Sequence, residues 1–178
     1  MKDTYFYVPS EKAARLVNLY REDSTGKLLK ADSKMLNGPV GADYPLHNST
    51  YYSGGAGLSS SIYDYAIFLQ MLLNNGVYNG KRLLSRNTVR IMTMNQIGDI
   101  SIRGDDKFGL GFQIVTEKSS GRTPAQAGTY SWGGAFATSY WVDPKEKIVL
   151  LFYRQLQGST HGDVVEKFRA LVYQAIND

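Results

Sequence analysis

The fold class follows from residues 138–153, which read TSYWVDPKEKIVLLFY. Two β-rich runs, 138–142 and 148–153, flank the polar segment DPKEK. A short turn segment between two such runs predicts a pair of antiparallel strands. The second run is apolar without alternation as far as Phe152, which is typical of a strand covered on both faces.

Helical periodicity precedes these strands. Apolar residues recur at a spacing of 3.6 between Ile62 and Leu73, which predicts an amphipathic helix. Ser60 or Ser61 is the expected cap of its start, and Asp64 completes a capping box with Ser61. The following Asn-Asn-Gly, ending at residue 76, predicts a left-handed end to the helix.

Two further helices are expected, one from Ser85 to about Asn95 and one from about Gly162 to Ile176. The second has an apolar stripe made of Val164, Val165, Phe168, Leu171, Val172 and Ile176. An antiparallel sheet covered by helices buries one face of each element, so the sequence predicts an α+β fold.

The remaining segments of the chain carry shorter sequence patterns. Residues 108–115 are predicted to form one strand, and the polar turn 23–26 is predicted to join the arms of a hairpin. Residues 31–57, rich in Gly, Pro, Asn and Ser, are predicted to be irregular. The acidic residues of loop 98–106 lack the alternation of a calcium loop and are expected to be solvated; they are Asp99, Asp105 and Asp106.

Composition narrows the function classes. The chain has 178 residues, which favours a single domain, and 43% of them are apolar against 20% charged. The absence of cysteine excludes disulfides, thiolate metal sites and a cysteine nucleophile. The two histidines, His47 and His161, have no neighbours at metal-ligand spacing, so no metal site is expected and solvated or locally hydrogen-bonded imidazoles are.

Binding to nucleic acid or insertion into a membrane is not expected either. The formal net charge is +4, and no basic tract interleaved with aromatic residues occurs. No apolar run approaches the ~18 residues of a membrane span. The compartment stays open, because proteins without disulfides occur in several compartments.

An ordered series of motifs resembles the penicillin-recognising serine hydrolases, in particular the class C β-lactamase-like branch. The segments that carry the resemblance are Met1-Lys2-Asp3-Thr4 with Phe6, Gly54 to Ser61 with Asp64 and Tyr65, Phe68 to Gly76, Gly80 to Ser85, Phe108 to Phe112, and Trp132 to Pro144. Each segment alone is weak evidence for the resemblance, whereas the ordered series, which covers nearly the whole chain, is specific. The resemblance implies a β-lactamase/transpeptidase-like fold whose N-terminal portion is missing, with residues 1–178 as the C-terminal portion of a single domain.

The family mechanism needs no cofactor. A serine in an S-x-x-K motif attacks a carbonyl, assisted by the lysine and by a tyrosine from a later Y-x-N motif. Both motifs precede the segment with which this chain begins, so neither is expected here. The chain does contain Ser24-x-x-Lys27, but these residues lie in a polar turn with Gly26, whereas the nucleophile needs a rigid helix start. No Y-x-N and no G-x-S-x-G occurs.

The third family motif, usually K-T-G, is matched by Trp132-Gly133-Gly134, a variant of esterase-like members. The resemblance implies that these three residues line the substrate site and that the backbone N–H of Ala135 is one half of the oxyanion hole. The missing lysine favours ester or amide substrates over β-lactams. Two alternatives stay open: the glycines form only a bulge or tight bend, and Trp132 is a core aromatic residue rather than a cleft wall.

These observations support three hypotheses. In the first, the chain is the C-terminal segment of a serine hydrolase, inactive alone, whose partners are its missing N-terminal segment or a second copy. In the second, it is a non-catalytic module that binds peptides or peptidoglycan. In the third, it is an active hydrolase that uses Ser24.

Overall fold

The computed structural model describes residues 1–31, 41–47 and 50–176. They form two compact units. Unit 1 comprises Met1–Tyr65, Ala135–Ala137 and Tyr153–His161, and unit 2 comprises Ala66–Gly134, Thr138–Phe152 and Gly162–Asp178. The chain therefore passes between the units more than once, and the single domain predicted over 1–178 stays a prediction.

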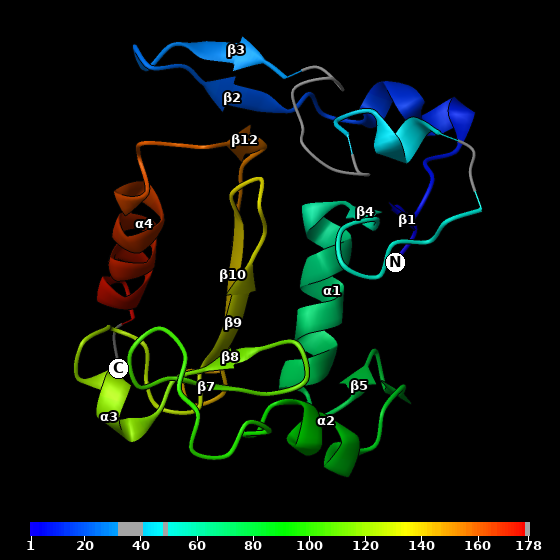
Figure 1. Ribbon diagram of the computed structural model, residues 1–178. Helices are drawn as coiled ribbons and strands as arrows, with labels where there is room; N and C mark the ends of the chain where they lie inside the picture. The colour runs from blue at the N-terminus through cyan, green and yellow to red at the C-terminus, as the bar shows by residue number, and fades with distance from the viewer. Residues whose placement is uncertain (32–40, 48–49, 177–178) are drawn as a thin grey trace. The chain divides into compact units, whose positions relative to one another are not determined.

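Unit 2 is built on a five-stranded sheet in the order β11-β10-β9-β8-β7 (Figure 1). The pairings of β7 with β8, β8 with β9 and β9 with β10 are antiparallel. The strands are β7 (Lys107–Phe108), β8 (Gln113–Ile114), β9 (Tyr130–Gly133), β10 (Thr138–Asp143) and β11 (Ile148–Tyr153). The two strands predicted within 138–153 are confirmed as β10 and β11.

The prediction of one strand over 108–115 was wrong, because the segment is a hairpin. The N–H of Gly109 donates to the carbonyl of Phe112 at 2.8 Å, and Gly111 has a φ of 94°. A Cβ at Gly109 would lie 2.2 Å from the carbonyl oxygen of Met92. Glycine is thus required at both places, and the segment turns instead of extending.

Helix α1 (Ile62–Leu73) is confirmed, and so is its left-handed end, with a φ of 53° at Asn75 and 90° at Gly76. The hydroxyl of Ser61 accepts the N–H of Asp64 at 3.1 Å. The second half of the predicted capping box was wrong. The N–H of Ser61 donates to the carbonyl of Asp3, and the Asp64 carboxylate is bound elsewhere.

Helix α2 (Arg86–Met92) begins after Ser85 as predicted, with the Ser85 hydroxyl accepting from Thr88, but ends earlier than Asn95. A short helix, α3 (Glu117–Ser120), was not expected. Between α1 and α2, strands β5 (Val77–Tyr78) and β6 (Lys81–Arg82) form a two-residue hairpin.

Helix α4 (Asp163–Gln174) stands beside the sheet in Figure 1, and the ring of Phe168 packs 5.0 Å from that of Phe152 on β11. Its apolar stripe is only partly covered, because Leu171 is 65% exposed. Of the six residues of β11, Leu150 is buried and the other five have intermediate exposure. Residues on both faces of β11 are thus at least partly covered, as the apolar run predicted.

Unit 1 contains two small sheets. Strand β1 (Thr4–Tyr5) pairs with β4 (Ser59–Ser60), and β2 (Tyr20–Glu22) lies between β12 (Leu156–Gln157) and β3 (Leu28–Lys30). The predicted hairpin around 23–26 is thus confirmed as β2–β3. Two 3-10 helices, η1 (Ser10–Arg15) and η3 (Tyr44–Leu46), complete the described part of the unit.

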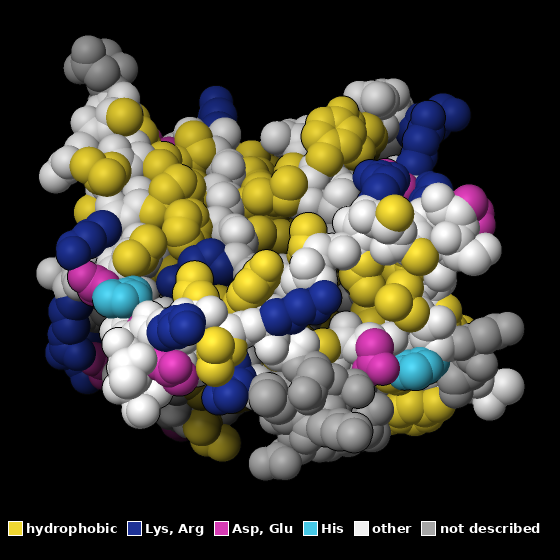
Figure 2. All heavy atoms as spheres, turned by 90° about the horizontal axis from the view of Figure 1, so that it is seen from above, with side chains coloured by type: hydrophobic (Ala, Val, Ile, Leu, Met, Phe, Trp, Pro, Cys, Tyr) yellow, Lys and Arg dark blue, Asp and Glu magenta, His cyan; other side chains and the backbone are white. Residues whose placement is uncertain are grey.

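Charged side chains are dispersed on the face drawn in Figure 2, where Lys and Arg are spread between groups of hydrophobic side chains. His47 and His161 are exposed, as predicted for solvated imidazoles. Their Nε2 atoms lie 3.2 Å from a carboxylate oxygen of Asp43 and 3.5 Å from one of Glu22, respectively. Within the described ranges, every helix is too short or too polar to cross a bilayer.

A buried carboxylate fastens α4 to the sheet. Asp143, at the end of β10, is 0% exposed. One of its oxygens accepts the N–H groups of Lys145 and Glu146, which closes the turn to β11, and the other accepts the hydroxyl of Tyr173 on α4 at 2.7 Å. Burial, with the Asp143 carboxylate beside it, raises the pKa of Tyr173, so the phenol stays a donor.

Replacing Tyr173 by phenylalanine should therefore lower the free energy of unfolding by about 1–3 kcal/mol, because one oxygen of a buried carboxylate loses its partner. The measurement is urea unfolding followed by circular dichroism. The control is Tyr63→Phe, at a side chain that is 71% exposed. Equal effects of the two substitutions would contradict the role given to the Asp143–Tyr173 bond.

Candidate functional site

The second half of β9 has an open edge. Strand β8 pairs only with Tyr130 and Ser131, so Trp132 and Gly133 extend beyond its end. On the other side, the N–H of Gly134 donates to the carbonyl of Thr138 at 2.9 Å. Because successive N–H groups point to opposite edges of a strand, the N–H of Gly133 points away from β10, toward the open edge.

The glycines of this segment have a packing reason. A Cβ at Gly134 would lie 2.5 Å from the hydroxyl oxygen of Thr138, and one at Gly133 would lie 3.0 Å from the Thr138 carbonyl oxygen. The close approach of β10 thus accounts for glycine at Gly134 without any substrate. Ala135 begins the turn 135–137, which belongs to unit 1, so its role in an oxyanion hole stays a prediction.

Trp132 is neither a buried core residue nor a freely exposed one. Its side chain is 38% exposed, and its ring meets the ring of Phe108 edge-on with centroids 4.9 Å apart. The guanidinium of Arg103 lies 5.1 Å from the indole centroid. The indole of Trp132 therefore contacts an aromatic side chain of β7 and a cation from another part of the chain.

A pocket of about 380 Å³ opens beside these residues, entirely within unit 2. It is formed by side chains of the sheet, of loop 103–106, of the α3 region and of α4. Its lining includes Arg103, Asp106, Gln113, Ser131, Trp132, Gly133, Ser139, Trp141, Glu166 and Arg169. The volume falls within the range of about 300–1,000 Å³ found for small-molecule sites.

The acidic residues of loop 98–106 were predicted to be solvated, which was wrong for Asp106. Asp106 is 6% exposed and accepts hydrogen bonds from Ser119 and Gln113. Asp105 is partly buried, and its hydrogen bond from Lys118, together with nearby cations, lowers its pKa. Sequence spacing alone carried no signal for this placement, since the partners of Asp106 lie on β8 and α3.

Comparison with known proteins agrees with this arrangement. A family model described as Beta-lactamase matches residues 1–174. The chain belongs to the Beta-lactamase family. Protein Rv1367c of Mycobacterium tuberculosis (strain H37Rv) is 32% identical over 167 residues, which cover 87% of this chain and 40% of that protein.

Two further proteins are similar over most of this chain. A putative D-alanyl-D-alanine carboxypeptidase of Escherichia coli (strain K12) is 26% identical over 163 residues, 90% of this chain and 36% of its own length. The solved structure of EstCE1, a hydrolase with promiscuous acyltransferase activity, superposes with a TM-score of 0.80 at 22% identity, covering 97% of this chain and 47% of that one. The chain thus spans less than half the length of these members of its fold.

The one S-x-x-K sequence of this Beta-lactamase family chain lies in the turn of the β2–β3 hairpin. The N–H of Asp23 donates to the carbonyl of Lys27, and Gly26 has a φ of 83°. One oxygen of the Asp23 carboxylate accepts the N–H groups of Thr25 and Lys27. The prediction that Ser24 and Lys27 lie in a turn rather than at a helix start is confirmed.

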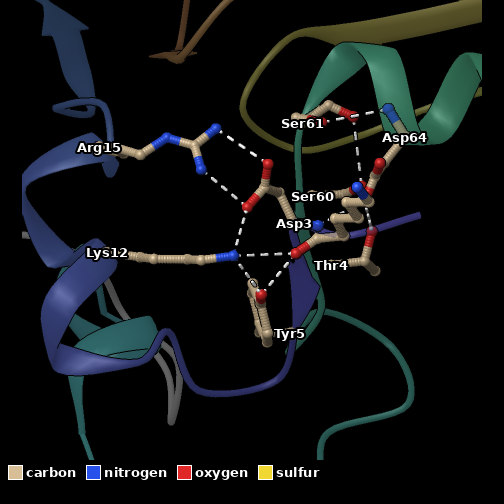
Figure 3. Close-up of polar contacts among 9 residues, drawn as sticks. Asp3, Thr4, Tyr5, Lys12, Arg15, Ser60, Ser61 and Asp64 are labelled. Carbon is tan, nitrogen blue, oxygen red and sulfur yellow. Dashed lines mark hydrogen bonds and ion pairs between the residues drawn. The ribbon is translucent and has the colours of Figure 1, made fainter.

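The first two segments of the family resemblance lie against each other. Figure 3 shows the Asp64 carboxylate of α1 accepting the N–H of Asp3 at 2.7 Å and the hydroxyl of Thr4 at 3.0 Å. The Thr4 and Ser60 hydroxyls are 2.8 Å apart. Burial raises the pKa of Asp64, but these hydrogen bonds outweigh it and lower the pKa overall. The motif residues of both segments therefore connect β1, β4 and α1.

Asp3 also carries a charge cluster. Its carboxylate accepts from Lys12 at 2.8 Å and from both terminal nitrogens of Arg15, at 2.7 and 3.0 Å (Figure 3). The hydrogen bond from Arg15, followed by that from Lys12, lowers the pKa of Asp3 from 3.8 to about 2. Asp3 thus holds η1 against β1.

The stability that Asp3 contributes should be present above about pH 4 and lost as the pH falls toward about 2, because its pKa is lower in the folded state. Asp3→Asn should therefore be less stable than the unchanged protein at pH 7, and the difference should shrink as the pH falls from 4 to 2. Urea midpoints across this range measure it. Asp99→Asn, on an exposed loop, is the control, and a difference that does not change with pH would contradict the assignment.

The packing reason for Gly134 is testable separately. Gly134→Ala should destabilise the protein by roughly 1–3 kcal/mol through overpacking against Thr138, and the cost should fall in a Thr138→Ala background. Gly121→Ala is the control, since a Cβ there has no heavy atom within 4 Å. Thermal unfolding of the four variants gives the comparison; a harmless Gly134→Ala would return the glycines to the substrate-contact explanation.

Proposed function

We propose that this chain is the C-terminal segment of an acyl-enzyme serine hydrolase and supplies its third-motif strand and one wall of its oxyanion hole. The substrate class is a small ester or amide. The isolated chain is inactive, because the serine, lysine and tyrosine of the family mechanism lie outside it. The observation that carries the proposal is the open edge of β9 at Trp132–Gly133 in a chain whose one S-x-x-K sequence forms a hairpin turn.

The chemistry of the β9 edge supports this role. A strand edge presents N–H groups at fixed positions, and such preorganised donors stabilise the charge that develops on a carbonyl oxygen. The N–H of Gly133 points to this edge. Ala135 follows the end of β9 and is proposed as a donor to the oxyanion on the family resemblance alone, with Trp132, Gly133 and Gly134 against the substrate.

The names of similar proteins support a hydrolase acting on amide or ester bonds. One relative is a putative D-alanyl-D-alanine carboxypeptidase, and EstCE1 is a hydrolase with acyltransferase activity. No cofactor takes part in the proposed mechanism. The proposed partners of this chain are a segment that carries the nucleophile or a second copy of the chain.

One observation favours the alternative of a non-catalytic peptide- or peptidoglycan-binding module. The pocket of about 380 Å³ lies within unit 2, so a ligand could be held without the nucleophile. The two proposals share the same pocket and differ in whether chemistry occurs beside it.

Treatment with a fluorophosphonate probe, followed by intact mass measurement, tests the proposal. We expect no added mass, because the one S-x-x-K sequence of the chain, Ser24 to Lys27, forms a hairpin turn instead of a helix start. An active serine hydrolase treated in parallel is the positive control. One stoichiometric adduct would contradict the inactivity, and its loss in Ser24→Ala would assign the chemistry to Ser24.

A further inference from the structure

The basic excess of the chain is concentrated in one stretch of sequence. Between Asp64 and Asp99 lie 34 residues without an acidic side chain, and four of them are basic. Because the formal net charge of the whole chain is +4, the rest of the chain is neutral on balance. A local excess of one sign of charge favours a partner of the opposite sign. The four basic residues are Lys81, Arg82, Arg86 and Arg90.

The fold brings these four cations onto adjoining elements of unit 2. Two of them make up β6, and the other two lie one turn apart on α2. The N–H groups of Leu83 and Leu84 both donate to the carbonyl of Gly76, at 2.8 and 3.2 Å, so the segment between β6 and α2 is fixed against the end of α1. Figure 1 shows α2 and β5 at this end of α1.

All four cations are exposed, and their charge is not compensated within the part of the chain that the structure describes. No carboxylate oxygen there lies within 4 Å of them. Arg82 donates to the carbonyls of Asn75 and Leu84, at 2.9 and 3.0 Å. Arg90 donates to the side-chain oxygen of Asn87, at 3.0 and 3.1 Å. Neutral partners orient a guanidinium without neutralising it, so the charge is left for an external anion.

Apolar side chains are exposed next to these cations. Leu83, Met94 and Leu110 are all at least 40% exposed. Leu83 directly follows β6, and the sulfur of Met94 lies 3.5 Å from a guanidinium nitrogen of Arg90. The N–H of Leu110 donates to the carbonyl of Met92 at 2.9 Å, which holds this side chain at the end of α2. The four cations and these three apolar residues are called the basic surface below.

The composition of the basic surface favours a lipid bilayer among anionic partners. Cations meet the headgroup phosphates of a bilayer while neighbouring aliphatic side chains enter the boundary of the acyl chains. Single-stranded nucleic acid is bound through exposed aromatic rings, whereas the exposed apolar members here are Leu and Met. Within the described ranges, Lys81 and Arg86 form no hydrogen bond or ion pair that would fix them for one carboxylate of an acidic protein. None of the four cations lines the pocket beside β9.

We propose that the basic surface adsorbs to the anionic headgroups of a lipid bilayer, with Leu83, Met94 and Leu110 reaching into the interface. Adsorption differs from spanning, for which the described helices are too short or too polar. Each cation held at an anionic leaflet adds to the affinity, and buried apolar area adds to it further. This interaction is separate from the proposed hydrolase role, because it uses other residues and needs no catalysis.

Flotation with lipid vesicles tests the proposal. The probe vesicles contain equal parts of phosphatidylcholine and phosphatidylglycerol, and vesicles of phosphatidylcholine alone are their uncharged match. We expect the chain to float in a saturable way with the anionic vesicles only. It should be released as the salt concentration rises toward about 1 M, where charges are screened within a few ångströms. Absence of flotation with the anionic vesicles, or equal flotation with both kinds, would overturn the proposal.

The double substitution Arg86→Gln with Arg90→Gln should weaken vesicle binding about 25-fold, or about fivefold for each cation, equivalent to about 1 kcal/mol per basic residue at an anionic surface. The control is Lys27→Gln with Lys30→Gln on the β2–β3 hairpin, which removes the same charge from exposed residues of unit 1. Circular dichroism checks that both double variants fold. Equal losses in the two would show that net charge alone binds the vesicles and would contradict a defined surface.

Leu83→Ser separates a bilayer from an acidic protein. It should weaken vesicle binding about threefold or more, because an aliphatic side chain no longer enters the interface. Binding to immobilised poly-glutamate, which has no apolar interior, should not respond to this change. Retention on poly-glutamate by a chain that does not float with vesicles would assign the surface to an acidic protein and reject the bilayer.

Discussion

The pairing of β9 with β10 is the constraint on which the candidate site depends. It sets Trp132 opposite Tyr140 and Gly133 opposite Ser139, and it directs the N–H of Gly133 to the edge that β8 leaves open. Since the side-chain period of a strand is two, a shift of one residue would reverse the direction of every group in this segment. In that register the N–H of Gly134 donates to the Thr138 carbonyl, and a Cβ at residue 134 would lie 2.5 Å from the Thr138 hydroxyl oxygen.

Buried carboxylates connect elements within each of the two units. Asp143 joins the turn after β10 to α4, Asp106 joins its loop to β8 and α3, and Asp64 joins α1 to β1. Each connects different elements of secondary structure, and each is satisfied by hydrogen-bond donors of neighbouring segments. A buried carboxylate is costly without such partners, so each of these residues makes the arrangement of its segments specific. The motif residues Asp3, Thr4 and Asp64, which carry part of the family resemblance, thus have a structural reason.

The acidic groups that line the pocket are likewise paired with donors of the protein. Asp105, Asp106 and Glu166 are matched within the wall, and the guanidinium of Arg103 lies on an indole instead of a carboxylate. In the K-T-G form of the motif the cation belongs to the strand itself. In this chain residue 132 is aromatic, and the cation that lies against it comes from loop 103–106.

The amino-acid sequence by itself determined the local elements: α1 with its Asn75-Gly76 end, the β2–β3 hairpin that contains Ser24, and the strands β10 and β11. Each depends on short-range periodicity or on turn residues, which act over a few positions. It also carried the ordered motifs of the Beta-lactamase family. The tertiary structure determined the rest. The partners of Asp64 and Asp106, the turn inside 108–112 and the contact of Arg103 with Trp132 all arise from contacts between different segments, and periodicity holds no information about which segments meet.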